Sequence, residues 1–323
     1  MTQVSPHGLH HVTAIATDPQ SNVDFYTRAL GLRLVKQTVN FDAPEAYHLY
    51  FGDEQGSPGS ILTWFEFAGA WKGRAGAGMV HTIQLGVASE ASLDFWAERL
   101  AAKGYASERG ERSLTFEDYD GLRFELVVAE RSGDETSGHG GVNPPLRAAH
   151  PDVPAEHAIL GVEGARAYSA RGLDADRALL TETLGFTESA PGEYRLDGHE
   201  RHFHWAYDAT NQRGQQGAGT VHHIAWHSRD EDHVAWQQRV RAAGMHVTPV
   251  IDRDYFHSVY FQQPQGILFE IATTSPGFAV DEDPEHLGEE LRLPTQHEHL
   301  RARLEQQLTP LTNPRTAERT PQA

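Results

Sequence analysis

The chain repeats one short unit four times, and this repeat restricts the possible folds more than any other feature. Each copy has the pattern of a strand, an amphipathic helix ending at Gly, and several further strands. The helix ends FYTRALGL and LLTETLGF match between copies one and three, and the closing strands GLRFELVVA and GILFEIATT match between copies two and four. Duplication of a βαβββ module explains both matches.

Each module is too small to bury a hydrophobic core alone, so the modules must pair through their strands. We therefore predict an α+β chain in which four βαβββ modules pair into two curved-sheet barrels. The N-terminal half covers 1–135, with modules at 8–68 and 78–130, and the C-terminal half covers 158–278, with modules at 158–208 and 219–278. Residues 130–157 are rich in Gly, Pro and charge, and we place the linker at 136–157.

The remaining residues, 279–323, form a polar tail. The segment HEHLRARLEQQL at 297–308 predicts one last helix. The stretch 309–323 is predicted to be disordered, because it offers few apolar side chains to bury.

Composition excludes several classes of protein. The 45 acidic and 27 basic residues give a formal charge of -18, which would repel a nucleic-acid backbone. No apolar run approaches the roughly 18 residues of a membrane span, and the N-terminus MTQVSPHGLH lacks a secretory pattern, so we expect a cytoplasmic protein. The absence of cysteine means that any metal must be held by nitrogen and oxygen ligands.

Two of the modules open on a strand with a His-His pair, and one closes on a strand with a glutamate between apolar neighbours. The pairs are His10–His11 and His222–His223, and the carboxylate is Glu270. Neighbouring strand residues face opposite ways, so we expect one histidine of each pair to point into the cup that the paired modules enclose. Two such histidines and one carboxylate are the ligand set of non-haem Fe(II) oxygenases. The set is complete only if modules one and four face each other.

The residues leave alternatives open. A lone strand histidine is more often a hydrogen-bonded core residue than a ligand, and a strand glutamate usually lies at a solvent edge or in an ion pair. Glu66, His202 and His204 are rival ligands, because Glu66 shares the strand face of the position equivalent to Glu270 and the two histidines alternate along one strand.

The segment 251–274 reads as a strand, a turn at QPQG and the closing strand, which brings Arg253, Tyr255, His257 and Tyr260 near the proposed metal. Aromatic side chains that flank a sheet often only pack. Arg253 has acidic neighbours on both sides with which it could pair.

The stretch from GLHHVTAIAT to GSILTWF, the strand VHHIAW and the segment DRDYFHSVYFQQPQGILFEIAT together resemble the ring-cleaving dioxygenases that act on hydroquinones. These enzymes belong to the glyoxalase, bleomycin-resistance and extradiol-dioxygenase superfamily, whose fold is the vicinal-oxygen-chelate fold. The resemblance covers about residues 8–278 and is weaker between about 86 and 210. It implies that His11, His223 and Glu270 hold iron. It also implies that five further residues surround the hydroxyarene: His10, Thr13, His222, Arg253 and Tyr260.

The resemblance implies an Fe(II)-dependent, extradiol-type dioxygenase that inserts both atoms of O2 into a hydroquinone or catechol and opens the ring. Mn(II) suits the same ligands. We assign acid–base work to His222 or His10, and substrate binding to Thr13, Arg253, Tyr260 and His257. The expected partners are an aromatic diol and O2, and a homo-oligomer is an open alternative.

Two rival functions remain. A glyoxalase-like lyase or isomerase would use the metal as a Lewis acid without O2, and such sites commonly carry more than one carboxylate ligand. A metal-free protein that binds an aromatic compound or a drug would not require His11 and His223 at all. Metal content and O2 uptake separate these functions.

Overall fold

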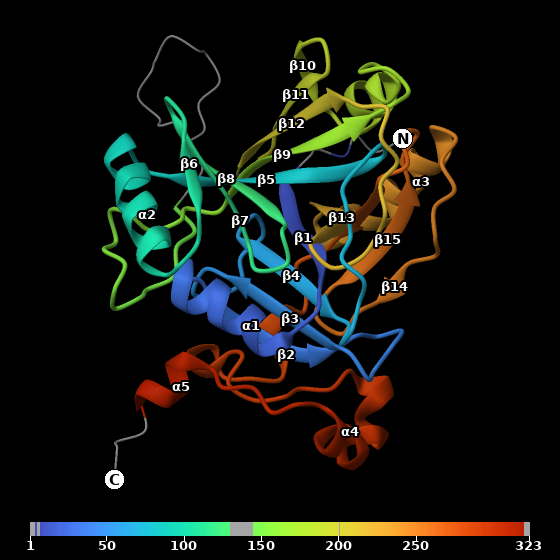
Figure 1. The fold of residues 1–323 in the computed structure, drawn as a ribbon. Coiled ribbons are helices and arrows are strands. Elements are labelled where there is room, and N and C mark those ends of the chain that lie inside the picture. Colours follow the sequence, from blue (N-terminus) through green and yellow to red (C-terminus); the bar gives the residue numbers. More distant parts are fainter. Residues whose placement is uncertain (1–3, 5–6, 130–144, 200, 320–323) are drawn as a thin grey trace.

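In the computed structural model, described for residues 4, 7–129, 145–199 and 201–319, the chain forms two curled eight-stranded sheets (Figure 1). One sheet has the strand order β14-β15-β16-β13-β1-β4-β3-β2, and the other has the order β10-β11-β12-β9-β5-β8-β7-β6. The first sheet joins modules one and four, and the second joins modules two and three. The α+β architecture of paired βαβββ modules is therefore confirmed.

The elements of the N-terminal half follow the predicted order. Module one contains β1 (Leu9–Ala16), α1 (Pro19–Val23) with a π-helical continuation (Asp24–Ala29), β2 (Arg33–Val39), β3 (Tyr47–Gly52) and β4 (Ile61–Glu66). Module two contains β5 (Met79–Val87), α2 (Glu90–Ala102), β6 (Ser107–Arg109), β7 (Ser113–Glu117) and β8 (Arg123–Val128). Each helix begins where a side chain caps it: the side chains of Asp18 and Ser89 accept hydrogen bonds from the backbone N–H groups of Ser21 and Ser92.

The C-terminal half repeats this order. Module three contains β9 (Val162–Ser169), a π-helical turn (Leu179–Thr183), β10 (Thr187–Ala190), β11 (Glu193–Asp197) and β12 (His202–Ala209). Module four contains β13 (Thr220–His227), a 3-10 turn (Asp230–Asp232), α3 (His233–Ala242), β14 (Ile251–Asp252), β15 (His257–Gln262) and β16 (Leu268–Ala272). Of the predicted linker, residues 136–144 lie outside the described residues. No helix in the described part of the chain is long and apolar enough to cross a membrane.

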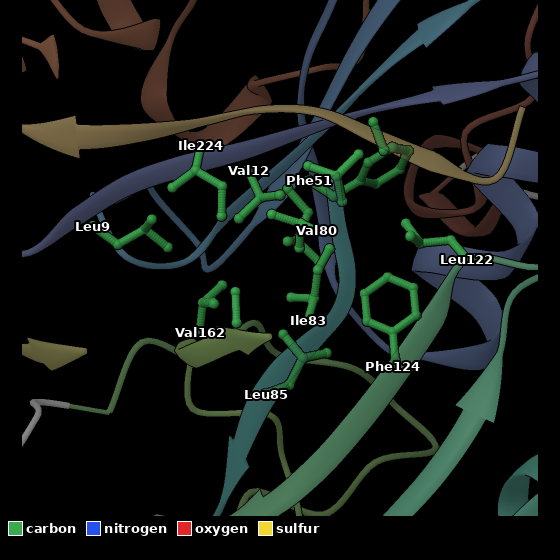
Figure 2. Packing of buried hydrophobic residues seen from close by; sticks show 14 of the residues in the cluster. Leu9, Val12, Phe51, Val80, Ile83, Leu85, Leu122, Phe124, Val162 and Ile224 are labelled. Carbon is green, nitrogen blue, oxygen red and sulfur yellow. The ribbon is translucent and has the colours of Figure 1, made fainter. Parts of the chain in front are cut away.

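The hydrophobic core lies between the two sheets, as Figure 2 shows. Val12 on β1 and Ile224 on β13 meet Ile83 on β5 and Val162 on β9, and all four are at most 1% exposed. Because side chains alternate along a strand, the residues beside these core positions point to the opposite, concave face of each sheet. The core therefore positions the polar side chains of β1 and β13 inside a cup.

The C-terminal tail packs along module one through both apolar and polar contacts. It contains three 3-10 turns (Phe278–Val280, Pro284–His286 and Thr295–Leu300) and the helices α4 (Arg301–Gln307) and α5 (Pro314–Arg319). The fully buried ammonium group of Lys36 on β2 pairs with the tail carboxylates Asp281 and Glu282. Of the helix predicted at 297–308, residues 301–307 form α4, and the residues before them belong to the 3-10 turn Thr295–Leu300.

The prediction of disorder from residue 309 onward was wrong for residues 309–319. Tyr47 on β3 donates a hydrogen bond to the carbonyl oxygen of Thr309 (2.9 Å), and Arg315 pairs with Glu54 (2.7 Å). The sequence pattern missed this order because ion pairs and backbone contacts with a distant module hold the segment in place. Residues 320–323 lie outside the described residues.

Candidate metal centre

Two β-bulges, one at each His-His pair, shape the cup of the first sheet. In the antiparallel pairing of β1 with β13, the register shifts once between Leu9 and His11 and again between Thr13 and Ala14. These shifts make His10 the extra residue on β1 and His222 the extra residue on β13. The expectation that only one histidine of each pair faces the cup was wrong for His222 and His223, since both rings line the same pocket. In both pairs the Nδ1 atoms of the two rings lie 2.8 Å apart, because side chains at a bulge do not alternate strictly between the two faces of the sheet.

His11 on β1, His223 on β13 and Glu270 on β16 converge on one point. The Nε2 atoms of the two histidines are 3.1 Å apart, and the Oε2 atom of Glu270 is 3.3 Å from His11 Nε2 and 2.9 Å from His223 Nε2. No other described group of three or more His, Asp or Glu residues brings its ligand atoms this close together. Neighbouring ligands of an octahedral ion, bound at about 2.1 Å, lie about 3.0 Å apart. The spacing of the three donor atoms therefore fits a facial set around a divalent metal.

Burial and the contacts among the three residues set the charge state of these ligands. Burial lowers the pKa of His223, which favours the neutral imidazole that a metal requires. Burial alone would raise the pKa of the Glu270 carboxyl, but its contacts with His11 and His223 hold that pKa well below the usual range. The hydroxyl of Ser258 on β15 donates a hydrogen bond to the other oxygen of Glu270, so the carboxylate is held on both sides.

The three ligands lie in the wall of a pocket of about 480 Å³. Arg253 and Tyr260 line the same pocket, and the Arg253 Nε–H group donates a hydrogen bond to the Tyr260 hydroxyl (3.2 Å). Burial would lower the pKa of Arg253, but Tyr260 and Asp42 raise it overall, so its positive charge is secure. Burial and Glu270 raise the pKa of Tyr260, which keeps this hydroxyl protonated.

The two bulge histidines differ in their access to this pocket. His222 lines it, and burial together with His223 lowers the pKa of His222 to about 4. His10 is only 3% exposed and does not line the pocket; it contacts His11 through Nδ1 and the backbone of Thr273 through a further hydrogen bond. His222 can therefore reach a bound ligand, whereas His10 orients His11.

Sequence reasoning missed a chain of polar side chains where β3 lines the pocket. His48 and Tyr50 on β3 both line the pocket, and the Tyr50 hydroxyl bonds to His48 Nδ1 (2.9 Å). His48 Nε2 contacts the Thr63 hydroxyl (2.5 Å), which lies 3.4 Å from that of Thr13. Thr13, predicted to bind substrate, is fully buried at the far end of this chain and does not line the pocket. The alternating polar positions of YHLYF could have indicated this part of the wall.

His257 was also predicted to bind substrate, and this assignment was wrong. Ser258 and Tyr260 on β15 face the cup, so strand alternation turns His257 to the other face of the sheet. There it lines a separate hollow of about 560 Å³ together with His233, the first residue of α3. Sequence spacing placed His257 near the metal but could not set the register of its strand.

Replacing His233 should stabilise the protein, and more strongly in acid. His233 is 3% exposed, neither ring nitrogen has a hydrogen-bond partner among the described residues, and burial lowers its pKa to about 4. Since the folded pKa lies below the unfolded value of about 6.5, the stability lost to protonation of the unfolded chain grows as the pH falls from 6.5 towards 4. We expect His233→Leu to raise the free energy of unfolding by about 1 kcal/mol at pH 7 and by about 2 kcal/mol more at pH 5.

Urea unfolding of the metal-free protein at both pH values measures this difference. Using metal-free protein removes any contribution from metal release in acid. An equal difference between variant and wild type at pH 5 and pH 7 would contradict the assignment.

The rival histidine ligands lie in the second sheet, where the described residues form no such metal cluster. In the cup of this sheet Thr82 and Gly164 occupy the two histidine-ligand positions, and Gln84 binds the carboxylate of Glu125 (2.8 Å). A Cβ atom at Gly164 would lie 2.4 Å from the Gln84 side-chain oxygen, so the space that a ligand would need is filled. His202 pairs instead with Glu163 (3.1 Å), and the ring of His204 packs against that of His202.

Glu66, the third rival ligand, also lies away from the cluster. Its carboxylate is 3% exposed at the end of β4, where burial and the charges of Asp120, Asp18 and Asp118 raise its pKa well above the usual range. Glu66 is therefore no second carboxylate for the metal. This removes the feature that favoured a glyoxalase-like site with several carboxylate ligands.

Two curled sheets of paired βαβββ modules, with two histidines and one glutamate converging in one cup, define the vicinal-oxygen-chelate class of metal sites. The family model described as Glyoxalase/Bleomycin resistance protein/Dioxygenase superfamily matches residues 8–126 and 168–271. The chain belongs to this superfamily.

Relatives in the superfamily match the chain over nearly its whole length. MhqO of Bacillus subtilis (strain 168), whose name assigns it provisionally to the ring-cleaving dioxygenases, is 43% identical over 94% of this chain and 96% of its own. Chlorohydroquinone/hydroquinone 1,2-dioxygenase of Sphingobium indicum is 31% identical, over 92% of this chain and 94% of its own.

Solved structures also resemble this fold. A crystal structure from Bacillus subtilis, described provisionally as a dioxygenase, matches with a TM-score of 0.86 and 40% identity, covering 96% of this chain and 99% of its own. Glyoxalase I from Zea mays, at 15% identity and a TM-score of 0.57, covers 83% of this chain and 92% of its own, and it shares the fold alone.

Proposed function

We propose that the chain is a non-haem Fe(II)-dependent dioxygenase of the ring-cleaving, extradiol type. It would insert both atoms of O2 into a hydroquinone or catechol-type hydroxyarene and open the ring. The observation that carries this proposal is the buried His11–His223–Glu270 cluster in the wall of a pocket with aromatic sides. The names of the relatives support the choice of reaction and of substrate class.

His11, His223 and Glu270 would hold the iron, and Mn(II) suits the same three donors. When bound, the metal supplies open coordination positions for an aromatic hydroxyl and for O2, together with a path for electron density between them.

Arg253 and Tyr260 would bind the hydroxyl group of the substrate and stabilise its negative charge. Arg253 carries a permanent positive charge, and Tyr260 holds a protonated hydroxyl beside it. A cation and a hydrogen-bond donor placed in advance favour the ionised hydroxyl without reorganisation. The proton that the substrate loses would leave to water through the open mouth of the pocket.

His222 would act as a hydrogen-bond donor to the substrate, and His10 as a positioning residue. A metal-bound His223 keeps its hydrogen on Nδ1 and donates it to Nδ1 of His222, 2.8 Å away. His222 then carries its own hydrogen on Nε2, from which it can donate a hydrogen bond to an oxygen atom of the substrate. The same relation between His11 and His10 orients the first ligand, but there the second hydrogen bond ends on the Thr273 backbone.

The test is anaerobic loading with Fe(II), followed by an oxygen-electrode assay over a panel of hydroquinones and catechols. We expect one O2 consumed per ring opened and a product heavier by two oxygen atoms. A protein that holds iron but consumes no O2 with any diol would exclude the proposed activity. A protein that contains neither iron nor manganese, and whose aromatic-ligand binding is unchanged in His223→Ala, would favour a binding module.

Arg253→Gln should reduce kcat/KM for hydroquinone about 10- to 100-fold, because the variant loses a hydrogen bond from a charged donor. Iron content should stay at the wild-type level, since Arg253 contacts none of the three ligands. The pH profile of kcat/KM should move to higher pH, because the substrate hydroxyl must then ionise without a neighbouring cation. An unchanged pH profile would show that Arg253 does not act on the ionisation.

A further inference from the structure

The pocket around the metal cluster is much larger than one aromatic ring. Its volume is about 480 Å³, whereas benzene fills a cavity of about 150 Å³. A dihydroxybenzene bound at His11, His223 and Glu270 would therefore leave more than half of the pocket without a ligand. The residues that line this surplus volume therefore bear on which hydroxyarenes can bind.

Apolar side chains that are only partly buried line this surplus volume. Phe65 on β4 lies beside the metal cluster, since its ring centroid is 6.3 Å from that of His223. Phe67 lies two residues further along the chain, and its ring centroid is 6.3 Å from that of Phe65. Ile251 and Leu268 face the same pocket from module four. All four remain partly exposed, so a ligand that covers them gains the free energy of burying apolar surface.

The charges at the mouth disfavour an anionic ligand group there. Arg253 is the only Lys or Arg among the described residues that line the pocket. Its guanidinium group lies between the rings of Phe41 and Tyr260 and contacts the carboxylate of Asp42 (3.5 Å). The side chain of Asp42 is 83% exposed. An anionic substituent at the mouth of the pocket would therefore be repelled by this carboxylate, and Arg253, which already pairs with Asp42, would not be free to neutralise the substituent.

We propose that this pocket takes hydroquinones that carry a bulky, uncharged, apolar substituent such as an aryl or tertiary alkyl group. This inference rests on the proposed function, because the diol is placed at the His11–His223–Glu270 cluster. The substituent lies against Phe67, Ile251 and Leu268. Two benzene-sized rings need about 300 Å³, which the pocket provides.

The test compares hydroquinone, tert-butylhydroquinone, phenylhydroquinone and 2,5-dihydroxybenzoate, the last as an anionic control. Dissociation constants are measured without O2 on the Fe(II)-loaded protein, and kcat/KM is then measured with O2. We expect phenylhydroquinone to bind about tenfold tighter than hydroquinone, through the added ring contacts. We expect 2,5-dihydroxybenzoate to bind more weakly than hydroquinone.

Phe67→Ala should reduce the advantage of phenylhydroquinone over hydroquinone from about tenfold to below about threefold, through loss of one aromatic contact. Ile251→Trp, which fills the same space, should also reduce it. Trp71→Ala is the matched control: it removes an aromatic side chain of the same loop that is 83% exposed and lies outside the pocket, so the ratio should stay the same.

Equal affinity for hydroquinone and phenylhydroquinone would overturn the inference and leave the dioxygenase proposal intact. Equal loss of affinity for both compounds in Phe67→Ala would also overturn it. Tight, Phe67-dependent binding of phenylhydroquinone without O2 uptake would support this use of the pocket and overturn the dioxygenase activity instead.

Discussion

Replacing His223 with alanine is expected to abolish both iron binding and ring cleavage. His223 supplies one of three donor atoms that lie within 3.3 Å of one another, and the remaining His11 and Glu270 cannot complete a facial set. Loss of a residue that only supports a ligand already costs about 10- to 100-fold in metal affinity. Loss of the ligand itself should lower iron affinity by more than about 100-fold, so the variant should be purified without iron.

Metal analysis, anaerobic Fe(II) titration and O2 uptake together measure this effect. His81→Ala is the control, because His81 on β5 of the second sheet holds the place next to the position equivalent to His223, and it pairs there with Asp208 (2.8 Å). It should keep full iron content and activity. Full iron content with unchanged affinity in His223→Ala would disprove the ligand assignment.

Separating the two sequence halves is expected to destroy the metal site as completely as the His223→Ala substitution does. β1 pairs with β13 and β5 pairs with β9, so each sheet is formed from both halves of the chain. His11 lies on one half, and His223 and Glu270 lie on the other. A half expressed alone would expose two unpaired central strands, which promotes aggregation, and would hold at most two of the three ligands.

The experiment expresses the two halves separately and together, with the break between residues 130 and 144. Neither half alone should bind iron tightly, whereas co-expression should restore one iron per pair. A protease site inserted in the same segment, cut after folding, is the control: the cut protein should keep its iron, because the sheets are already paired. Tight binding by the C-terminal half alone would contradict this pairing of modules.

The repeat explains why much of the fold was accessible from the sequence. Matching helix ends and closing strands identified four modules, and the two His-His strands, with Glu270 on a closing strand, indicated that modules one and four must share a sheet. The strand order shows that pairing. The alternation of apolar residues and the spacing of the repeats are local signals, so they do not depend on how distant parts of the chain fold.

Register and bulges were not accessible in the same way. Strict alternation predicted that only one histidine of each pair faces the cup, but a one-residue bulge in each strand brings His10 against His11 and places His222 beside His223 in the pocket wall. Strand alternation turns His257 to the face opposite that of Ser258 and Tyr260. The bulges depend on hydrogen bonds between strands, which no single segment encodes.

The sequence by itself determined the modules, the nitrogen and oxygen character of the metal ligands and the identity of His11, His223 and Glu270 as their candidates. Only the tertiary structure decided that one ligand atom from each of these residues lies within 3.3 Å of the other two. It also decided that His48 and Tyr50 line the same pocket. Glu66, His202 and His204 lie outside the cluster. The physical reason is that the type of each ligand residue can be read from its own segment of the sequence. The distance between the ligand atoms depends instead on how strands more than 200 positions apart in the chain pair with each other.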